Sequence, residues 1–344
     1  MGKLTVVHLF NFSKGSRYPS MISQGLYIHP EIEVSFAMPF ISLGRIISPP
    51  DKHLSESLLK ADYIFRCDDE HFGFDEIDRF LDINDLWSKV VYYDFKDSTE
   101  IDFHRLSTCN AYVKRSWASG INREPIEVPD IPILPVDFGL LDEYFERPAP
   151  EKKDIDICHM FPPDKRIGVR RYNVYRELDA QRGNFGNAVI GVPTAAAQAG
   201  RRAIFNPPED NPFLDYLDYL KRSKIVFTAF PDHWDGDSRT WEAFSSGALV
   251  FMDATTIPSP KPFISGKHCF IYDARKPASI RNAIAIAKDL LKNETTRQTI
   301  AKEGYQHALS FHKPVDRVNQ ILKWIKSPSK KLSEHVDTRQ TFTV

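Results

Sequence analysis

The sequence predicts an α/β protein made of two halves, each a parallel β-sheet with helices on both faces. Short apolar runs alternate with segments of helical character, and this alternation starts again after the middle of the chain. Between the two series, residues 146–153 (ERPAPEKK) combine two prolines with charges, as is typical of a linker. At roughly 150 residues per domain, the 344 residues are enough for two. We therefore expect two Rossmann-like domains, at 1–145 and 154–326, followed by a polar tail at 327–344.

The composition excludes several classes of protein. Lys and Arg number 45, Asp and Glu number 46, and the net charge of −1 argues against a nucleic-acid partner. The four cysteines form no CxxC pair, so neither a disulfide framework nor a zinc knuckle is expected, and reduced thiols indicate a cytoplasmic protein. Because no apolar stretch approaches the ~18 residues of a membrane span, no transmembrane segment is expected. The N-terminus also lacks the features of a signal peptide.

The first half contains apolar runs that predict strands, and two segments that predict helices. The first strand is expected to end in a loop at 11–17. The run at 131–136 contains Pro132 and Pro135, which predicts an edge strand or a connector. The strands are expected at 4–10, 61–66, 89–94 and 111–114, and the helices at 54–60 and 74–81.

The second half repeats this pattern more strongly. One helix is expected at 238–246, with Ser238 as its N-cap and Gly247 as the residue that ends it. The other helices are expected at 169–178, 213–222, 277–291, 294–310 and 314–326, and the strands at 154–158, 188–191, 224–230, 248–253 and 268–273.

Residues 223–258 carry the strongest signal of a binding site. They form a predicted strand, loop, helix and strand, and ligands of open α/β sheets bind beyond the carboxyl ends of strands, where loop 231–237 lies. The free N–H groups and positive dipole of the next helix favour a phosphate or diphosphate. Arg239 would add a bidentate phosphate contact, and Glu242, on the same helix face, would accept hydrogen bonds from sugar hydroxyls. Alternatively, Arg239 and Glu242 form a surface pair.

A second positive segment follows the first strand of the second half. The sequence MFPPDKRIGVRRYNVYREL contains four basic residues within seven positions, at a strand-to-helix turn where phosphates commonly bind. The alternative is a solvated basic helix start, since four such residues cannot all be ligands. The four residues are Lys165, Arg166, Arg170 and Arg171.

The helix at 238–246 resembles a known family. SRTWEAFSSGALVFMD is similar to the donor-site helix of GT-B glycosyltransferases of the group 1 type, and closest to the CgeB-like (spore maturation protein) branch. The resemblance continues through SGKHCFIYDA, AIAKDLLKNETTRQTIAKEGYQHALSFH and DRVNQIL, and so covers about 154–325. The first half matches by its strand pattern and by AYVKRSW.

The resemblance implies a GT-B fold, with two Rossmann-like domains facing a cleft and a last helix that packs back onto the first domain. It also implies retaining, metal-independent transfer of a sugar from a nucleotide-sugar donor, which is a substrate, so no separate cofactor is expected. The donor would bind the second domain and the acceptor, a glycan, a lipid-linked molecule or a protein, the first.

The resemblance also assigns roles by position. Glu242 matches the glutamate that holds the ribose or the donor sugar, Gly247 the small residue that ends the helix, and Arg239 a basic residue of the CgeB-like branch. The second glutamate of the family, eight residues before the first, is replaced by Trp234; Asp235 or Asp237 is the candidate substitute.

The expected catalytic residues are Glu242, Arg239 and Arg170, of which Arg170, with Arg166, would neutralise the departing diphosphate. Tyr272 follows a strand that lies near the nucleotide base in this family. The residues expected to bind the donor are therefore Arg166, Arg170, Asp237, Ser238, Arg239, Thr240, Glu242 and Tyr272.

Two other functions stay open. Asp235-Gly236-Asp237 and Asp154-Ile155-Asp156 are DxD sequences, which bind Mn²⁺ in another class of glycosyltransferases, so a metal-dependent transferase is one alternative. The replacement at Trp234 motivates the other, a non-catalytic module that binds a nucleotide sugar or a glycan.

Several polar residues of the first half follow predicted strands and could meet the acceptor. His268 is expected to lie in the core or at a strand edge, and His307 and His312 to act as cations at a helix end. Trp117, Trp234 and Trp241 could stack on sugar rings. The candidate acceptor residues are Asn11, Ser13, Lys14, Ser16, Asp94, Lys96, Asp97, Lys114 and Arg115.

Overall fold

The structure is a computed structural model. It describes residues 2–10, 17–42, 45–67, 75–96, 98, 100–118, 133–146, 148, 150, 152–161, 165, 168–191, 212–232, 234–257 and 259–327.

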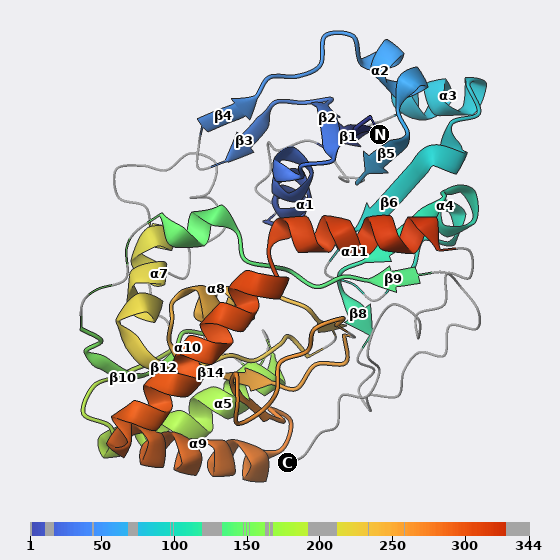
Figure 1. The fold of residues 1–344 in the computed structure, drawn as a ribbon. Coiled ribbons are helices and arrows are strands. Elements are labelled where there is room, and N and C mark those ends of the chain that lie inside the picture. The colour runs from blue at the N-terminus through green and yellow to red at the C-terminus, as the bar shows by residue number, and fades with distance from the viewer. Residues whose placement is uncertain are drawn as a thin grey trace.

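Six parallel strands form the sheet of the N-terminal half, in the order β2-β1-β5-β6-β7-β9 (Figure 1). All five residues of β6 are buried, as expected for a parallel sheet that is covered on both faces. The strands are β1 (Leu4–Leu9), β2 (Ile32–Phe36), β5 (Tyr63–Arg66), β6 (Val90–Asp94), β7 (Ala111–Lys114) and β9 (Ile133–Pro135). A separate hairpin pairs β3 (Phe40–Ser42) with β4 (Arg45–Ser48).

Helices lie on both faces of this sheet. On one face, α1 (Arg17–Ile28) packs its apolar residues on alternate residues of the strands. On the other face lie α2 (Leu54–Lys60), α3 (Asp75–Ile83) and α4 (Phe103–Thr108). Two short 3-10 helices, η2 (Trp87–Lys89) and η3 (Asp142–Phe145), complete this half.

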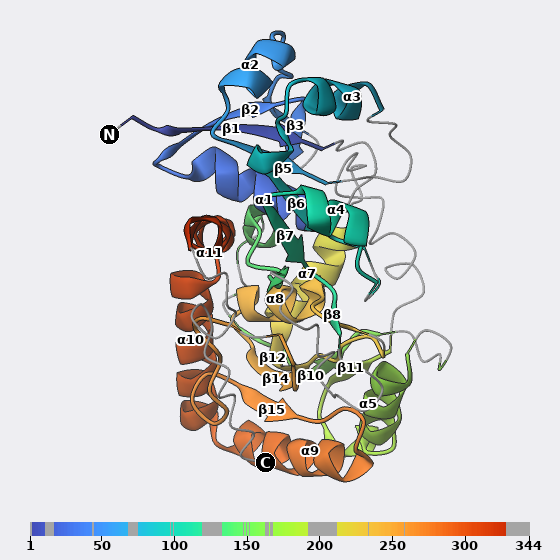
Figure 2. The ribbon, with the colours of Figure 1, turned by 90° about the vertical axis from the view of Figure 1, so that its right-hand side faces the viewer.

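Five parallel strands form the second sheet, in the order β11-β10-β12-β14-β15. Apolar residues of α5 and α9 fill one face, while α7 and α8 cover the other with α10 beside α8 (Figure 2). The strands are β10 (Ile155–His159), β11 (Ala188–Ile190), β12 (Ser223–Phe227), β14 (Leu249–Asp253) and β15 (Phe270–Tyr272). The helices are α5 (Val169–Asp179), η4 (Arg182–Asn184), α7 (Pro212–Arg222), α8 (Ser238–Ser245), α9 (Pro277–Lys292) and α10 (Glu294–Phe311).

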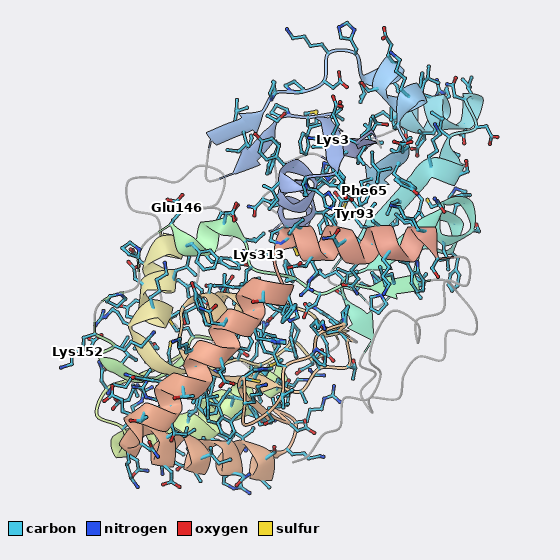
Figure 3. All side chains as sticks on the ribbon, viewed as in Figure 1. Lys3, Phe65, Tyr93, Glu146, Lys152 and Lys313 are labelled. Carbon is cyan, nitrogen blue, oxygen red and sulfur yellow. The ribbon has the colours of Figure 1, made fainter. Side chains whose placement is uncertain are left out.

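The last helix, α11 (Pro314–Lys326), leaves the second half and packs against α1. Lys313, labelled in Figure 3, is its N-cap and marks the turn from α10. Two polar contacts fasten it there: His29 Nε2 lies 2.9 Å from Asn319 Oδ1, and Arg317 donates to Phe138 O at 3.0 and 2.8 Å. The prediction that the last helix returns to the N-terminal half is confirmed.

A short strand pair joins the two halves directly. β8 (Trp117–Ala118), just after β7, pairs antiparallel with β13 (Trp234–Asp235), which follows β12. The segments that follow the carboxyl ends of the two sheets therefore touch each other.

Most predicted elements are confirmed, often to within one or two residues. The predicted run at 131–136 contains an edge strand, β9. The Ser238 N-cap is wrong: Asp237 caps α8, because its Oδ1 accepts from Arg239 N at 3.2 Å, and Ser238 is the first helical residue. Gly247 has a φ of +65° after the last turn of α8, as a glycine that ends a helix requires. The predictions missed α1, α4, β2 and the hairpin, and the tail beyond 327 lies outside the described residues.

Gly25 provides a test of the contact between α1 and α11. A Cβ at this position would lie 2.4 Å from Pro314 O and 2.7 Å from Val318 Cγ2. Although alanine is the better helix former, we expect Gly25→Ala to lower the free energy of unfolding by at least about 1 kcal/mol, because overpacking outweighs propensity. Denaturant unfolding measures this change. Gly183→Ala, where no atom lies within 4 Å of the added Cβ, is the matched control and should change stability little.

Candidate active site

Arg170 lies at the centre of the carboxyl edge of the second sheet. It stands in the first turn of α5, only 2% exposed, and its Nη1 donates to Asp235 Oδ1 at 2.9 Å and to Asp253 Oδ2 at 3.3 Å. Burial disfavours its charge, but the carboxylates of Asp253 and Asp235 outweigh this effect and raise the pKa of Arg170 above its usual value. Asp235 also accepts from Thr256 N and Oγ1 at 2.6 and 2.7 Å. The guanidinium is thus held rigidly between two strand ends.

Arg171, the next residue, is the second arginine at this edge of the sheet. Its Nη2 pairs with Asp237, its Nε donates to Ala229 O at 3.0 Å, and its guanidinium lies 4.5 Å from the centre of the Phe161 ring. Burial, with nearby Arg239, lowers the pKa of Arg171 from its usual value despite the attraction of Asp237. Its side chain is 16% exposed, which makes Arg171 the more accessible arginine of the two.

The N-terminus of α5 already binds an anionic group. Asp232, in the loop after β12, accepts from Val169 N at 2.5 Å and from Arg170 N at 2.8 Å. Each carboxylate oxygen therefore satisfies one of the free amides of the first turn, which a phosphate would also fit. Arg166, predicted to lie here, falls outside the described residues.

Helix α8 holds the acidic residue expected to contact the donor. Glu242 is fully buried; its Oε2 accepts from Arg239 Nη1 and its Oε1 from Ser238 Oγ, both at 3.0 Å. The guanidinium of Arg239 lies 4.6 Å from the centre of the Tyr216 ring and is 31% exposed at the side chain. The i,i+3 pair considered as the alternative does form, but it is not a surface pair, because Glu242 is enclosed.

Two other predicted donor residues are also buried. Thr240 Oγ1 lies 3.1 Å from Thr228 Oγ1, and the Tyr272 hydroxyl donates to Thr228 O at 2.7 Å. Burial, with the nearby carboxylate of Asp253, raises the pKa of the Tyr272 hydroxyl well above its usual value. Both side chains contact Thr228, the residue that follows β12, and their contacts with a donor stay predictions.

The aspartates of both DxD sequences form ion pairs with basic side chains. Asp235 and Asp237 face Arg170 and Arg171, and each is further bonded to a loop or helix amide. Asp154 and Asp156 pair with Arg222 and Lys224 on the outside of the sheet, at 2.5 and 2.6 Å. Within the described parts of the chain, no group of three or more His, Cys, Asp and Glu residues is placed to hold a metal ion. A divalent cation bound by Asp235 and Asp237 would have to displace Arg170 and Arg171, which already neutralise these carboxylates.

The N-terminal half brings its candidate acceptor residues to the carboxyl ends of β6 and β7. Asp94 Oδ2 accepts from Lys114 Nζ at 2.6 Å and from the Tyr112 hydroxyl at 2.7 Å, and all three are buried. Burial lowers the pKa of Lys114, although Asp94 opposes the shift. Arg115 reaches across to the second half. Lys96 is exposed, and its main-chain N donates to Asp94 Oδ1 at 3.0 Å. The other candidates, Asn11, Ser13, Lys14, Ser16 and Asp97, lie outside the described residues.

The hydrogen bonds of His312, at the end of α10, favour a neutral ring rather than the expected cation. His312 is buried; Arg317 Nη2 donates to its Nδ1 at 2.9 Å, so its Nε2 carries the proton that Lys261 O accepts, also at 2.9 Å. Burial, with Arg317 nearby, lowers the pKa of His312 well below its usual value. Burial likewise lowers the pKa of His268 to about 4, and this ring stacks on His307 at a centroid distance of 4.1 Å. The prediction that His268 lies in the core or at a strand edge is confirmed.

The sequence analysis does not single out three residues of this site. Arg171 appears there only as one of four basic residues, and the carboxylates Asp232 and Asp253 are not named. Asp253 ends β14 at the carboxyl edge, so the rule that singled out loop 231–237 would also have found it. Asp232 lies within that loop, but its partners are 62 and 63 residues away, and no spacing indicates them.

Several solved structures share this architecture. An alpha-glucosyltransferase in complex with UDP-glucose and DNA containing an abasic site has a TM-score of 0.60 and 10% identity, over 94% of this chain and 99% of the other. A glycosyltransferase from Rickettsia africae has a TM-score of 0.53 and 11% identity, over 95% and 98%. HepE from Anabaena, in complex with UDP and glucose, has a TM-score of 0.50 and 12% identity, over 93% and 98%. The chain has the GT-B fold.

A match in sequence adds to this likeness in fold. Residues 189–323, which include α8 with Arg239 and Glu242, match the family described as glycosyl transferase-like. Over this stretch the chain is similar in sequence to glycosyl transferases, and the architecture that surrounds it is GT-B. No curated protein is similar enough in sequence to this chain to count as a match. In the described part of the chain, no helix has the length and apolar character to cross a membrane.

The lowered pKa of His268 predicts how the stability of this protein responds to acid. Because the folded state keeps His268 neutral down to a pKa of about 4, against 6.5 for an ordinary histidine, the unfolded state binds the proton first. The free energy of unfolding should therefore fall as the pH drops from 6.5 towards 4. Asn keeps the acceptor for Ile264 N that His268 Nδ1 supplies at 3.2 Å, so His268→Asn should make this fall shallower in urea titrations. The exposed His104, changed to Asn, is the control; equal slopes for H268N and wild type would contradict the account.

Proposed function

We propose that the protein transfers a sugar from a nucleoside diphosphate donor, bound at the carboxyl edge of the second sheet, to an acceptor held by the N-terminal half. The observation that carries this proposal is the grouping, at one edge, of two arginines, the amides of the α5 N-terminus and the α8 segment that matches the glycosyltransferase family. Retention of anomeric configuration and kinship with the CgeB-like branch rest on the sequence resemblance.

The donor we propose is a uridine diphosphate sugar. Two structures of similar fold contain UDP-glucose or UDP with glucose, and both cover nearly all of this chain. UDP-glucose is therefore the first donor to test. The first of these structures also contains DNA, but the net charge of −1 favours a glycan, a lipid-linked molecule or a protein as the acceptor here.

We assign the diphosphate to Arg171, Arg239 and the first-turn amides of α5. Arg171 and Arg239 keep part of their side chains exposed, whereas Arg170 is enclosed between two carboxylates and holds the loop in place. When the bond between the anomeric carbon and the diphosphate oxygen breaks, its electron pair stays on the diphosphate, and fixed positive groups stabilise that charge. Glu242, fixed by Ser238 and Arg239, would orient the ribose or the sugar.

The transfer we propose needs no divalent metal. The carboxylates of Asp235 and Asp237 are neutralised by guanidinium groups, which supply the positive charge that Mn²⁺ would bring. We also place the protein in the cytoplasm, since its four cysteines are free thiols, three of them buried.

Nucleotide binding tests the donor site. A ligand at 100 times its dissociation constant stabilises a protein by roughly 2.7 kcal/mol, so thermal shifts with UDP, GDP, ADP, CMP and dTDP will reveal the preferred base. We expect UDP to stabilise the protein equally in EDTA and in Mn²⁺. Arg171→Ala should weaken UDP binding about tenfold, as expected for a lost charged hydrogen bond.

Arg222→Ala is the matched control, since this exposed arginine pairs with Asp154 away from the edge; it should leave the UDP shift intact. Stabilisation that needs Mn²⁺ would contradict the metal-independent proposal. A panel in which no nucleotide stabilises the protein would contradict the donor site itself, and binding without release of UDP to any acceptor or to water would favour the non-catalytic alternative.

A further inference from the structure

Arg115 links the two halves by hydrogen bonds to main-chain oxygens from each. Its side chain is buried: Nε and Nη2 donate to Phe95 O at 2.9 and 2.6 Å, and Nη1 donates to Gly236 O at 3.0 Å. The guanidinium also lies 5.3 Å from the centre of the Phe138 ring. Phe95 follows β6 in the N-terminal half, whereas Gly236 lies in the loop that precedes α8. One planar guanidinium group therefore fixes the distance between these two carbonyl groups, one from each half.

Gly236 is shaped for this contact. Its φ is +96°, and a Cβ at this position would lie 2.8 Å from Ile257 Cδ1, 3.0 Å from Arg115 O and 3.2 Å from Asp137 Oδ1. A side chain at this position would therefore meet atoms of both halves and displace the loop. On one side of this point, β13 pairs with β8, with Trp234 opposite Ala118 and Asp235 opposite Trp117.

The residues that flank Gly236 hold the arginines of α5. Asp235 accepts from Arg170, and Asp237 pairs with Arg171. A continuous path thus runs from Phe95 O through Arg115 and Gly236 to the two arginines. A shift of the loop by the length of one hydrogen bond would move both carboxylates, and with them the side chain assigned to the diphosphate.

We propose that Arg115 is a positioning residue, which sets the loop Asp235–Asp237 and thereby the α5 arginines when the N-terminal half is docked. The part that concerns the donor rests on the proposed function. The coupling is reciprocal: a donor that stabilises this arrangement of Arg171 also stabilises the docked position of the N-terminal half. The position of the N-terminal half, which we propose binds the acceptor, is thereby coupled to the donor site in the second half.

Hydrogen–deuterium exchange of the full chain without ligand tests the coupling independently of any nucleotide. In Arg115→Ala, amides of 234–239 and of 169–171 should exchange at least about tenfold faster, the effect of losing one buried hydrogen bond to a charged group, while β10, β12 and β14 keep their protection. Arg115→Lys can still reach Phe95 O but cannot bridge both carbonyls, so it should fold as wild type and show the same local effect.

Arg105→Ala is the matched control. This arginine also lies in the N-terminal half, but it bonds Asp78 of its own half at 3.0 Å, so the exchange at 234–239 should stay as in wild type. Unchanged exchange at 234–239 in both Arg115 variants would overturn the proposal, as would a uniform increase over all strands in Arg115→Lys, which shows a merely structural role.

Titration with UDP tests whether Arg115 also affects the proposed donor site. We expect Arg115→Lys to bind UDP about tenfold more weakly than wild type, with little further loss when Arg171→Ala is added, because both changes disable one path. Full additivity, or wild-type affinity in Arg115→Lys, would overturn the coupling to the donor site. Failure of wild type to bind any nucleotide would instead refute the proposed function, and the exchange experiment would still decide whether Arg115 positions the loop.

Discussion

The carboxyl edge of the second sheet depends on two ion pairs made by consecutive residues: the buried pair of Arg170 with Asp235 and the partly buried pair of Arg171 with Asp237. Removing one partner of a buried pair such as Arg170–Asp235 costs about 3–5 kcal/mol, because the other charge is left buried without compensation. The pairs therefore fix the loop before α8 to the first turn of α5. The other features of the site depend on the position in which the pairs hold this loop. These features are the capped N-terminus of α8, the Asp232 carboxylate on α5 and the contact with Arg115.

The same pairs explain why a DxD sequence occurs here without a metal-ligand geometry. In this chain the two aspartates serve as internal counterions, and the arginines that they hold provide fixed positive charge at the edge. A guanidinium is always charged and offers several donors in one plane, so it suits diphosphate oxygens that need both charge and direction. Asp232 occupies the amides of α5, and a bound diphosphate would compete with it for the same two N–H groups.

Much of the second half could be predicted because each element is a continuous run with clear ends. Helix α11, for example, begins at Pro314 and ends at Lys326 as expected. Helix α1 was missed because Gly25 interrupts its pattern, and the reason for that glycine, the close approach of Pro314, is a contact between residues distant in sequence. The site shows the same limit: the spacing of Arg239 and Glu242 predicts their pairing, whereas Arg170 and Asp235 lie 65 residues apart and only the fold brings them together.

A crystal structure of the protein with UDP would test the central claim most directly. The account predicts the diphosphate within hydrogen-bond distance of Arg171 and of the first-turn amides of α5, with Asp232 displaced from those amides and the pair between Arg170 and Asp235 intact. A diphosphate bound away from α5, or held through a cation between Asp235 and Asp237 with both arginines turned aside, would contradict it.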